Sequence, residues 1–136
     1  MTILIAEDNL AHQKITEYVL KKHNVPAGHI VVHDGQQVLD YLHNVGQYEN
    51  KEKYPMPNLI LLDLNLPKRD GREVLKLIKE DSQFKNIPVV IVSTSDREED
   101  LVFASRMGVV GYISKSIGFD TFSFELGSVL QYARPE

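Results

Sequence analysis

Carboxylates, hydroxyls and one ammonium group each follow a short apolar run in this chain, at the point where a strand would end. Two acids follow the first run, one aspartate the third, two hydroxyls the fourth and a lysine the fifth. In chain order these residues are Glu7, Asp8, Asp63, Ser93, Thr94 and Lys115. Ligands of open parallel sheets bind beyond the carboxyl ends of the strands, so we expect these side chains to converge on one rim.

Three crowded carboxylates predict a bound cation at that rim. Carboxylates that lie close together repel one another, and a cation relieves the repulsion. The chain has no cysteine and its five histidines are scattered along the sequence. The available donors are therefore oxygens, which favours Mg²⁺ over Zn²⁺ as the cofactor.

Asp63 is the expected nucleophile. An aspartate beside a bound cation can capture a phosphoryl group as an aspartyl phosphate. The cation, Lys115 and a hydroxyl would share the phosphoryl oxygens and stabilise the charge that spreads over them during transfer. Taken singly, the residues have ordinary explanations, because Glu7 and Asp8 could cap the next helix and Asp63 could begin a turn. Their joint position at the ends of four runs favours the functional interpretation.

The apolar runs are the strands that must position these residues. They are continuous rather than alternating, which is typical of strands buried on both faces of a parallel sheet. The predicted strands span residues 3–6, 30–32, 59–62, 89–92 and 111–114. Helix-period segments separate them, so the expected fold is α/β, a doubly wound (βα)₅ sheet with five parallel strands and right-handed crossovers.

Each predicted helix has an apolar stripe that we expect to face the sheet. In order the stripes are Leu10, Ala11, Ile15, Tyr18 and Val19; Val38, Leu39, Leu42 and Val45; Val74, Leu75 and Ile78; Leu101, Val102 and Met107; and Phe119, Phe122, Leu126, Val129, Leu130 and Ala133. The connection over residues 46–58 is long for such a unit, in which loops of about two to six residues are usual. It is either a tolerated surface insertion or a loop that contacts a partner.

The composition is that of an ordinary globular domain. The 136 residues are 43% hydrophobic and 25% charged, which suits a single domain with one substantial core. The net charge of −4 and the absence of a basic run argue against a nucleic-acid partner. No apolar run approaches the roughly 18 residues of a membrane span, and the first residues lack the basic start of a signal peptide. We therefore expect a cytoplasmic protein without a membrane partner.

Four motifs resemble the receiver domain of two-component response regulators, and together they cover essentially the whole chain. They are Ile-Leu-Ile-Ala-Glu-Asp-Asn at residues 3–9, Leu-Ile-Leu-Leu-Asp-Leu-Asn-Leu-Pro-Lys-Arg-Asp-Gly at 59–71, Pro-Val-Val-Ile-Val-Ser at 88–93 and Gly-Tyr-Ile-Ser-Lys at 111–115. The resemblance implies a flavodoxin-like sheet of strand order 2-1-3-4-5 and a single receiver domain over residues 1–136, with no output domain. It also implies a phosphoacceptor signalling protein that promotes only its own phosphorylation and dephosphorylation, rather than an enzyme.

The resemblance assigns a role to each acid. Asp63 would accept the phosphoryl group. Glu7, Asp8 and Asp63 would hold Mg²⁺, and the backbone carbonyl of Asn65 would be a further ligand.

The same resemblance implies the switch residues. Ser93 stands where most receivers have threonine and keeps the hydroxyl that turns toward the phosphoryl group, while Lys115 matches the lysine that contacts it. Tyr112 matches the aromatic residue that changes burial on activation. The output face would combine the fourth helix, fifth strand and fifth helix, where Phe124 is expected to be exposed and to contact a second copy or a kinase. Ser116 replaces the usual proline after the lysine, and a cis bond before serine costs about 2.5–4 kcal/mol, so the shape of this loop is left open.

The expected partner is a histidine kinase. The long 46–58 connection, the segment 63–75 and the pair Lys115-Ser116 together resemble the receivers that partner phytochrome-type histidine kinases. A homodimer is a further expected assembly. His12, close to the acid pair, is expected to be a solvated helix residue, and contact with a docking kinase is the alternative.

Three other functions fit these residues less well. A phosphatase of the haloacid dehalogenase kind needs a second aspartate two residues after the nucleophile as general acid, where this chain has Asn65. A flavodoxin needs a hydroxyl-rich phosphate loop after the first strand, where Glu7 and Asp8 would repel phosphate. A binding module that has lost phosphorylation would lack Asp8, Asp63 or Lys115, and all three are present.

Overall fold

The computed structural model describes residues 1–25 and 28–134, which form one five-stranded parallel sheet covered by helices. The strands are β1 (Thr2–Ala6), β2 (Gly28–Val32), β3 (Leu59–Leu62), β4 (Val89–Ser93) and β5 (Gly111–Ser114). Their order in the sheet is β2-β1-β3-β4-β5, and all neighbouring pairs are parallel. The predicted α/β fold and strand order are therefore confirmed, and every predicted strand lies within two residues of its observed ends.

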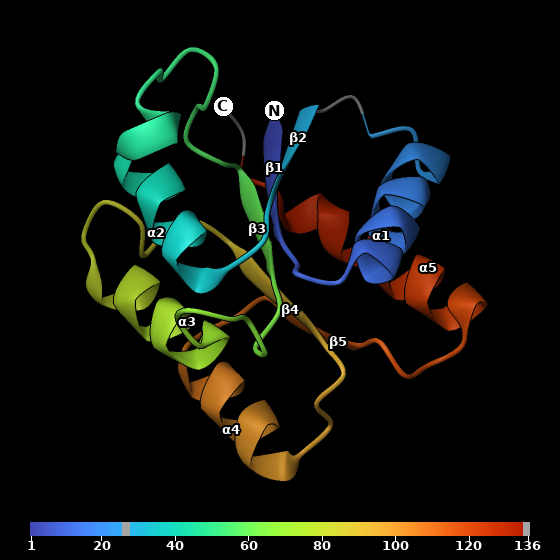
Figure 1. Cartoon of the computed structure of the whole chain (residues 1–136). Coiled ribbons are helices and arrows are strands. Elements are labelled where there is room, and N and C mark those ends of the chain that lie inside the picture. The colour runs from blue at the N-terminus through green and yellow to red at the C-terminus, as the bar shows by residue number, and fades with distance from the viewer. Residues whose placement is uncertain (26–27, 135–136) are drawn as a thin grey trace.

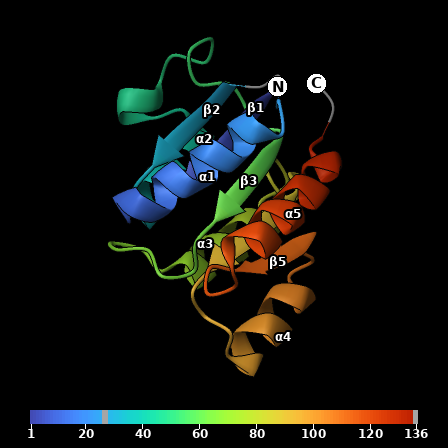
Figure 2. The ribbon, with the colours of Figure 1, turned by 90° about the vertical axis from the view of Figure 1, so that its right-hand side faces the viewer.

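Helices cover both faces of the sheet (Figure 1). They are α1 (Leu10–Lys22), α2 (Gly35–His43), α3 (Gly71–Glu80), α4 (Glu98–Arg106) and α5 (Phe119–Val129), with short 3₁₀ turns η1 (Gly46–Tyr48) and η2 (Leu130–Tyr132). Helices α2, α3 and α4 lie on one face, and α1 and α5 lie side by side on the other (Figure 2). Within the described residues, no helix combines the length and the apolar character needed to span a membrane.

Two hydrophobic clusters, one on each side of the sheet, form the core. Successive strand side chains point to opposite faces, so Leu4 and Ile60 join the cluster under α2, α3 and α4, whereas Ile3 and Leu59 join the cluster under α1 and α5. The central strands β3 and β4 are buried along their whole length, as their continuous apolar runs predict. The edge strands β2 and β5 are only partly buried, because each has a neighbouring strand on one side alone.

The predicted buried stripe of α1 is wrong in part. Leu10 and Tyr18 are 61% and 60% exposed, whereas Thr16 and Leu20 are buried. Apolar residues occur around much of the circumference of this helix, so their period alone does not select one arc. Packing against the sheet and against α5 selects it instead.

The predicted stripe of α4 is also wrong in part. Leu101 and Val102 are each 42% exposed, and the buried residues of the helix are Asp100 and Ala104. A charged residue occupies the inner face because it has an ion-pair partner on α3, described below. Hydrophobic periodicity cannot anticipate such a pairing.

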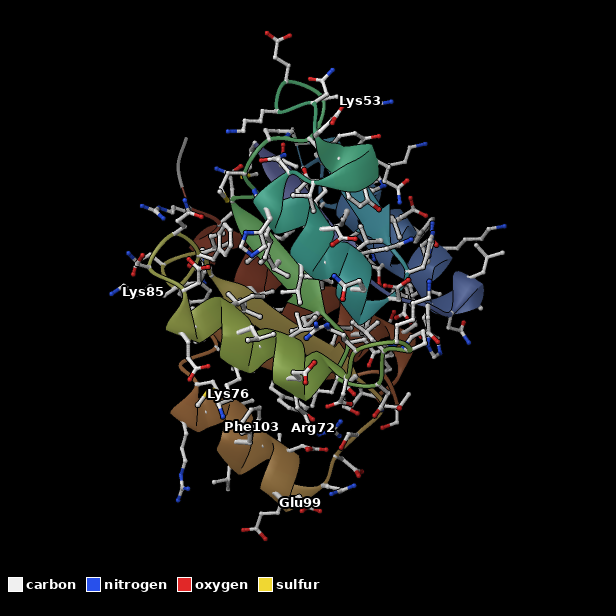
Figure 3. All side chains as sticks on the ribbon, turned by 60° about the vertical axis from the view of Figure 1, so that its left-hand side comes forward. Lys53, Arg72, Lys76, Lys85, Glu99 and Phe103 are labelled. Carbon is white, nitrogen blue, oxygen red and sulfur yellow. The ribbon has the colours of Figure 1, made fainter. Side chains whose placement is uncertain are left out.

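The long connection after α2 is folded against that helix. Tyr41, Tyr48 and Tyr54 form a cluster with ring centroids 5.1–5.8 Å apart. The Tyr41 hydroxyl donates to the Pro55 carbonyl at 2.8 Å, and the Asn44 side-chain amide donates to the carbonyls of Tyr48 and Tyr54. The charged tip of the loop, which includes Lys53, points away from the body of the molecule (Figure 3). The loop is thus anchored at its base, and its contact with a partner stays a prediction.

Candidate functional site

The carboxyl ends of β1, β3, β4 and β5 meet at one edge of the sheet. Backbone hydrogen bonds continue past the strands, since the Asp63 N–H donates to the Ala6 carbonyl at 3.2 Å and the Lys115 N–H donates to the Ser93 carbonyl at 2.8 Å. Strand register therefore places the first residues after each strand beside one another. The convergence that the sequence predicts is present.

Three carboxylates lie close enough to share one ion. Glu7, Asp8 and Asp63 each offer an oxygen atom, and these atoms all lie within 4.8 Å of one another. Glu7 and Asp63 are 4% and 6% exposed, while Asp8 is open to solvent. A hard divalent cation with oxygen ligands and retained waters suits such a half-open set of acids. The residues therefore fit the predicted metal site.

Lys115 balances part of this negative charge. Its Nζ donates to Asp63 Oδ2 at 2.8 Å and forms an ion pair with Glu7 Oε1. Its side chain is 5% exposed, so the ammonium group is held among the acids and not in bulk water. Buried charges persist when they are paired and hydrogen-bonded in this way.

The surroundings of Glu7 raise the pKa of its carboxyl group. Burial raises the pKa of the Glu7 carboxyl, while its hydrogen bonds with Lys115 and with the backbone N–H of Asn9 partly oppose that rise. Asp63 adds to the increase by charge repulsion. The Lys115 ammonium thus does not fully offset the burial of Glu7, and a bound cation would further favour its charged form.

The turn after β3 orients Asp63. The backbone N–H of Asn65 donates to Asp63 Oδ1 at 3.0 Å, which leaves Oδ2 for Lys115. The start of α3 approaches this turn very closely: a Cβ on Gly71 would lie 2.2 Å from the Asp63 carbonyl oxygen and 2.6 Å from Leu64 Cα. Only glycine permits that approach, so the phosphoacceptor candidate is fixed by the strand before it and the helix after it.

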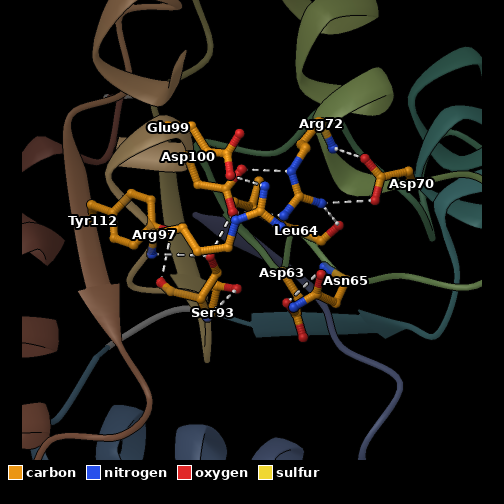
Figure 4. A network of polar contacts seen from close by, with 11 residues as sticks. Asp63, Leu64, Asn65, Asp70, Arg72, Ser93, Arg97, Glu99, Asp100 and Tyr112 are labelled. Atoms are coloured by element: carbon orange, nitrogen blue, oxygen red, sulfur yellow. Dashed lines mark hydrogen bonds and ion pairs between the residues drawn. The ribbon is translucent and has the colours of Figure 1, made fainter. Parts of the chain in front are cut away.

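Ser93 and Tyr112 meet at the loop after β4. Ser93 is fully buried, and its Oγ accepts from the Ser95 N–H at 3.2 Å. The half-buried Tyr112 donates from its hydroxyl to the Ser95 carbonyl at 2.8 Å (Figure 4). Burial raises the pKa of the Tyr112 phenol. The structure therefore joins the two predicted switch residues through Ser95.

An ion pair between α3 and α4 is the main feature that sequence reasoning missed. Arg72 donates from Nε and Nη2 to the two carboxylate oxygens of Asp100, both at 2.7 Å, and it also contacts Asp70 (Figure 4). Asp100 accepts a further hydrogen bond from the Ser95 hydroxyl. Charged residues 28 positions apart carry no local signal of pairing. Only the folded arrangement of α3 and α4 brings them together.

The structure also bears on His12, Phe124 and the peptide bond after Lys115. His12 is not simply solvated: it is partly buried, and its Nδ1 lies 3.2 Å from Lys115 Nζ. Phe124 is 75% exposed, which confirms its predicted orientation on α5. The described residues contain no cis peptide bond, so the bond between Lys115 and Ser116 is trans.

Comparisons with known proteins agree with this architecture. The family described as the response regulator receiver domain matches residues 3–124. The response regulator Rcp1 of Synechocystis sp. is 44% identical over 114 residues, which is 84% of this chain and 76% of that protein. The probable methanogenesis regulatory protein FilR2 of Methanothrix harundinacea is 33% identical over 132 residues, 96% of this chain and 81% of that protein.

Solved structures give the same result. The Mn²⁺-bound form of Rcp1 superposes with a TM-score of 0.85 at 39% identity, covering 94% of this chain and 90% of that one. The phosphorylated cyanobacterial phytochrome response regulator RcpA superposes with a TM-score of 0.86 at 39% identity, covering 97% and 92%. The chain belongs to the response regulator receiver domain family and is related to the phytochrome response regulators.

Proposed function

We propose that this chain accepts a phosphoryl group on Asp63 from a histidine kinase and signals through the resulting change of shape. The observation that carries the proposal is the contact of Asp63 Oδ2 with Lys115 Nζ at 2.8 Å, inside a cluster of three acids. A nucleophilic carboxylate, a fixed ammonium and a cation site are the parts that phosphoryl transfer to aspartate requires.

The chemical step is a displacement at phosphorus. A carboxylate oxygen of Asp63 attacks the phosphorus of the kinase phosphohistidine, a P–O bond forms, and the P–N bond breaks with its electron pair returning to the imidazole nitrogen. Lys115 donates hydrogen bonds to a phosphoryl oxygen as negative charge spreads over the group. Ser93 can donate its hydroxyl hydrogen to a phosphoryl oxygen once its side chain turns toward Asp63 and its Oγ no longer accepts from the Ser95 N–H.

Glu7, Asp8 and Asp63 would hold Mg²⁺, with the Asn65 backbone carbonyl as a further ligand. When bound, the divalent cation supplies positive charge that offsets the acids and the phosphoryl oxygens. The Mn²⁺-bound form of the relative Rcp1 supports a divalent ion of this type. The protein's own residues supply the nucleophile, the ammonium and the hydroxyl.

Signalling follows from the link between Ser93 and Tyr112. Movement of Ser93 changes the loop that carries Ser95, and Tyr112 is hydrogen-bonded to that loop. The face formed by α4, β5 and α5, with Phe124 exposed on it, is the proposed output face.

The phosphorylated phytochrome regulator RcpA is among the similar structures, so we infer that the partner is a phytochrome-type kinase in the cytoplasm. We also infer that Phe124 contacts either a second copy of the chain or the kinase. We infer a single receiver domain that catalyses no reaction beyond its own phosphorylation and dephosphorylation.

The test is phosphorylation by acetyl phosphate followed by intact-mass measurement. Wild-type protein and Asp63→Asn are incubated with and without Mg²⁺. A Mg²⁺-dependent gain of one phosphoryl group that is absent in Asp63→Asn supports the proposal. No gain, or an equal gain in Asp63→Asn, overturns it and makes a phosphorylation-independent binding module the leading function.

A further inference from the structure

His12 makes a contact that the proposed function does not yet use. It lies in the first turn of α1, and its Nδ1 is 3.2 Å from Lys115 Nζ. A lysine ammonium has hydrogens to donate and no lone pair to accept with. The Nδ1 atom must therefore be the acceptor, which leaves the ring neutral with its proton on Nε2.

Lys115 consequently has a partner for each of its three ammonium hydrogens. Two partners are the carboxylates of Glu7 and Asp63, and the third is the imidazole of His12. The two carboxylates belong to the acid cluster that would hold the cation, whereas His12 does not. His12 is thus the partner of Lys115 that stays available when the acids are occupied by an ion and a phosphoryl group.

The position of His12 is itself fixed by the same site. Glu7 Oε2 accepts from the Asn9 N–H at 3.1 Å, and the Asn9 side-chain oxygen accepts from the His12 N–H at 3.0 Å. His12 then contacts Lys115, which returns to the other oxygen of Glu7. These four residues form a closed ring of polar contacts, so the helix N-cap sets where the imidazole stands relative to the ammonium.

We propose that His12 is a positioning residue for phosphoryl transfer, which accepts a hydrogen bond from Lys115 and keeps its ammonium directed toward Asp63. The inference rests on the proposed function. Without this acceptor, Lys115 would lose its fixed position once Glu7 and Asp63 engage other groups. The rate of phosphoryl uptake falls as a result, because catalytic hydrogen bonds depend on prior orientation.

The test compares His12→Leu with His12→Asn. Leucine and asparagine have nearly the same shape, but only asparagine offers an oxygen acceptor near the position of Nδ1. We expect His12→Leu to lower the maximal rate of phosphorylation by acetyl phosphate about tenfold, because one hydrogen bond to a charged group is lost. The half-saturating Mg²⁺ concentration should change less than about twofold, since His12 is not one of the acids that would hold the ion. His12→Asn should recover at least about half of the wild-type rate. Gln13→Leu, one position along the same helix, serves as the control and should match wild type.

Several outcomes would overturn the inference. Equal rates for His12→Leu and His12→Asn would show that no acceptor is needed at this position. A loss seen only with a histidine kinase as donor, and not with acetyl phosphate, would make His12 a docking contact instead. If wild-type protein takes up no phosphoryl group, the proposed function fails and the positioning role fails with it; uptake by wild type with an unaffected His12→Leu variant defeats the positioning role alone.

A spectroscopic measurement examines the contact independently of turnover. The ¹⁵N chemical shifts of the His12 ring, recorded on unphosphorylated protein, should report a neutral ring with a hydrogen-bonded Nδ1. Lys115→Met should move the Nδ1 resonance to the position of a free acceptor. A resonance that is unchanged by Lys115→Met would contradict the contact on which the inference stands.

Discussion

Arg72 on α3 and Asp100 on α4 face each other across two parallel hydrogen bonds, each 2.7 Å long. The Asp100 side chain is 4% exposed and that of Arg72 28%, so the pair lies mostly out of solvent. Asp100 also accepts from the hydroxyl of Ser95, whose N–H donates to Ser93. The ion pair thus connects two helices with the loop that carries the proposed phosphorylation switch.

Asp100→Asn should destabilise the protein by about 2–4 kcal/mol, because the mostly buried guanidinium of Arg72 loses the more buried of its two carboxylate partners and keeps only the exposed Asp70. The measurement is urea unfolding near neutral pH. The neighbouring Glu99→Gln is the matched control, because the Glu99 side chain is 69% exposed and pairs with the exposed Arg97. A change within about 0.5 kcal/mol is expected there. Equal effects of the two variants would show that the α3–α4 ion pair contributes little.

The contribution of Asp100 should disappear in acid. Hydrogen bonds from Arg72 lower the pKa of the Asp100 carboxyl from its ordinary 3.8 to about 2. Because the folded-state pKa is depressed, the stabilisation is fully present above the unfolded-state value and is lost as the pH falls from about 4 toward 2. The difference in unfolding free energy between wild type and Asp100→Asn should therefore be constant above about pH 5 and shrink below about pH 4. A difference that grows on acidification would contradict the assignment.

Two phenylalanines of α5 should behave in opposite ways. Phe122 is 6% exposed, and Phe122→Ala is expected to cost about 3–5 kcal/mol of stability. Phe124 is 75% exposed, and Phe124→Ala should change stability by less than about 0.5 kcal/mol. Two measurements then test Phe124 as an output residue. Light scattering gives the molecular mass of the phosphorylated and unphosphorylated protein, and a binding assay gives its affinity for a histidine kinase. Unchanged mass and unchanged kinase binding in Phe124→Ala would remove it from the output face.

Gly71→Ala should disturb the site directly. The new methyl group would meet the Asp63 carbonyl oxygen at 2.2 Å, and these are backbone atoms that cannot rotate away. We expect a loss of about 1–3 kcal/mol and slower phosphorylation by acetyl phosphate. Gly28→Ala is the control, since its added Cβ would meet no atom within 4 Å. Wild-type phosphorylation by Gly71→Ala would mean that the turn after β3 moves without affecting Asp63.

The strands and the rim could be predicted because the signals are local. A continuous apolar run identifies a buried parallel strand, and the next residue must then lie at the carboxyl edge of the sheet. This pattern predicts that Asp63 and Lys115 lie at the same edge, and the structure brings them into contact. Their roles as nucleophile and charge-stabilising ammonium follow from the residue types at that edge, whereas the roles of the Asn65 carbonyl and of Tyr112 required the resemblance to receiver domains.

The features that escaped prediction depend on packing between distant segments. Asp100 lies on the buried side of α4 because Arg72 reaches it from α3, and no periodicity encodes that meeting. His12 contacts Lys115 across 103 residues of sequence. The spacing of Tyr18 predicts that it faces the sheet, yet it lies on the outer side of α1 beside Phe119. Helix rotation and long-range polar pairs are set by tertiary contacts, which override local preference.

The cluster of Tyr41, Tyr48 and Tyr54 determines what optical spectroscopy can observe in this protein. The chain has six tyrosines and no tryptophan, so half of its strongest ultraviolet chromophores lie together beside α2. Their loop precedes β3 and is therefore at the amino edge of the sheet, opposite Asp63. Near-ultraviolet dichroism and intrinsic fluorescence should consequently report the integrity of that loop far more strongly than the state of Tyr112. A fluorine label on Tyr112 would be the more direct means of following the switch.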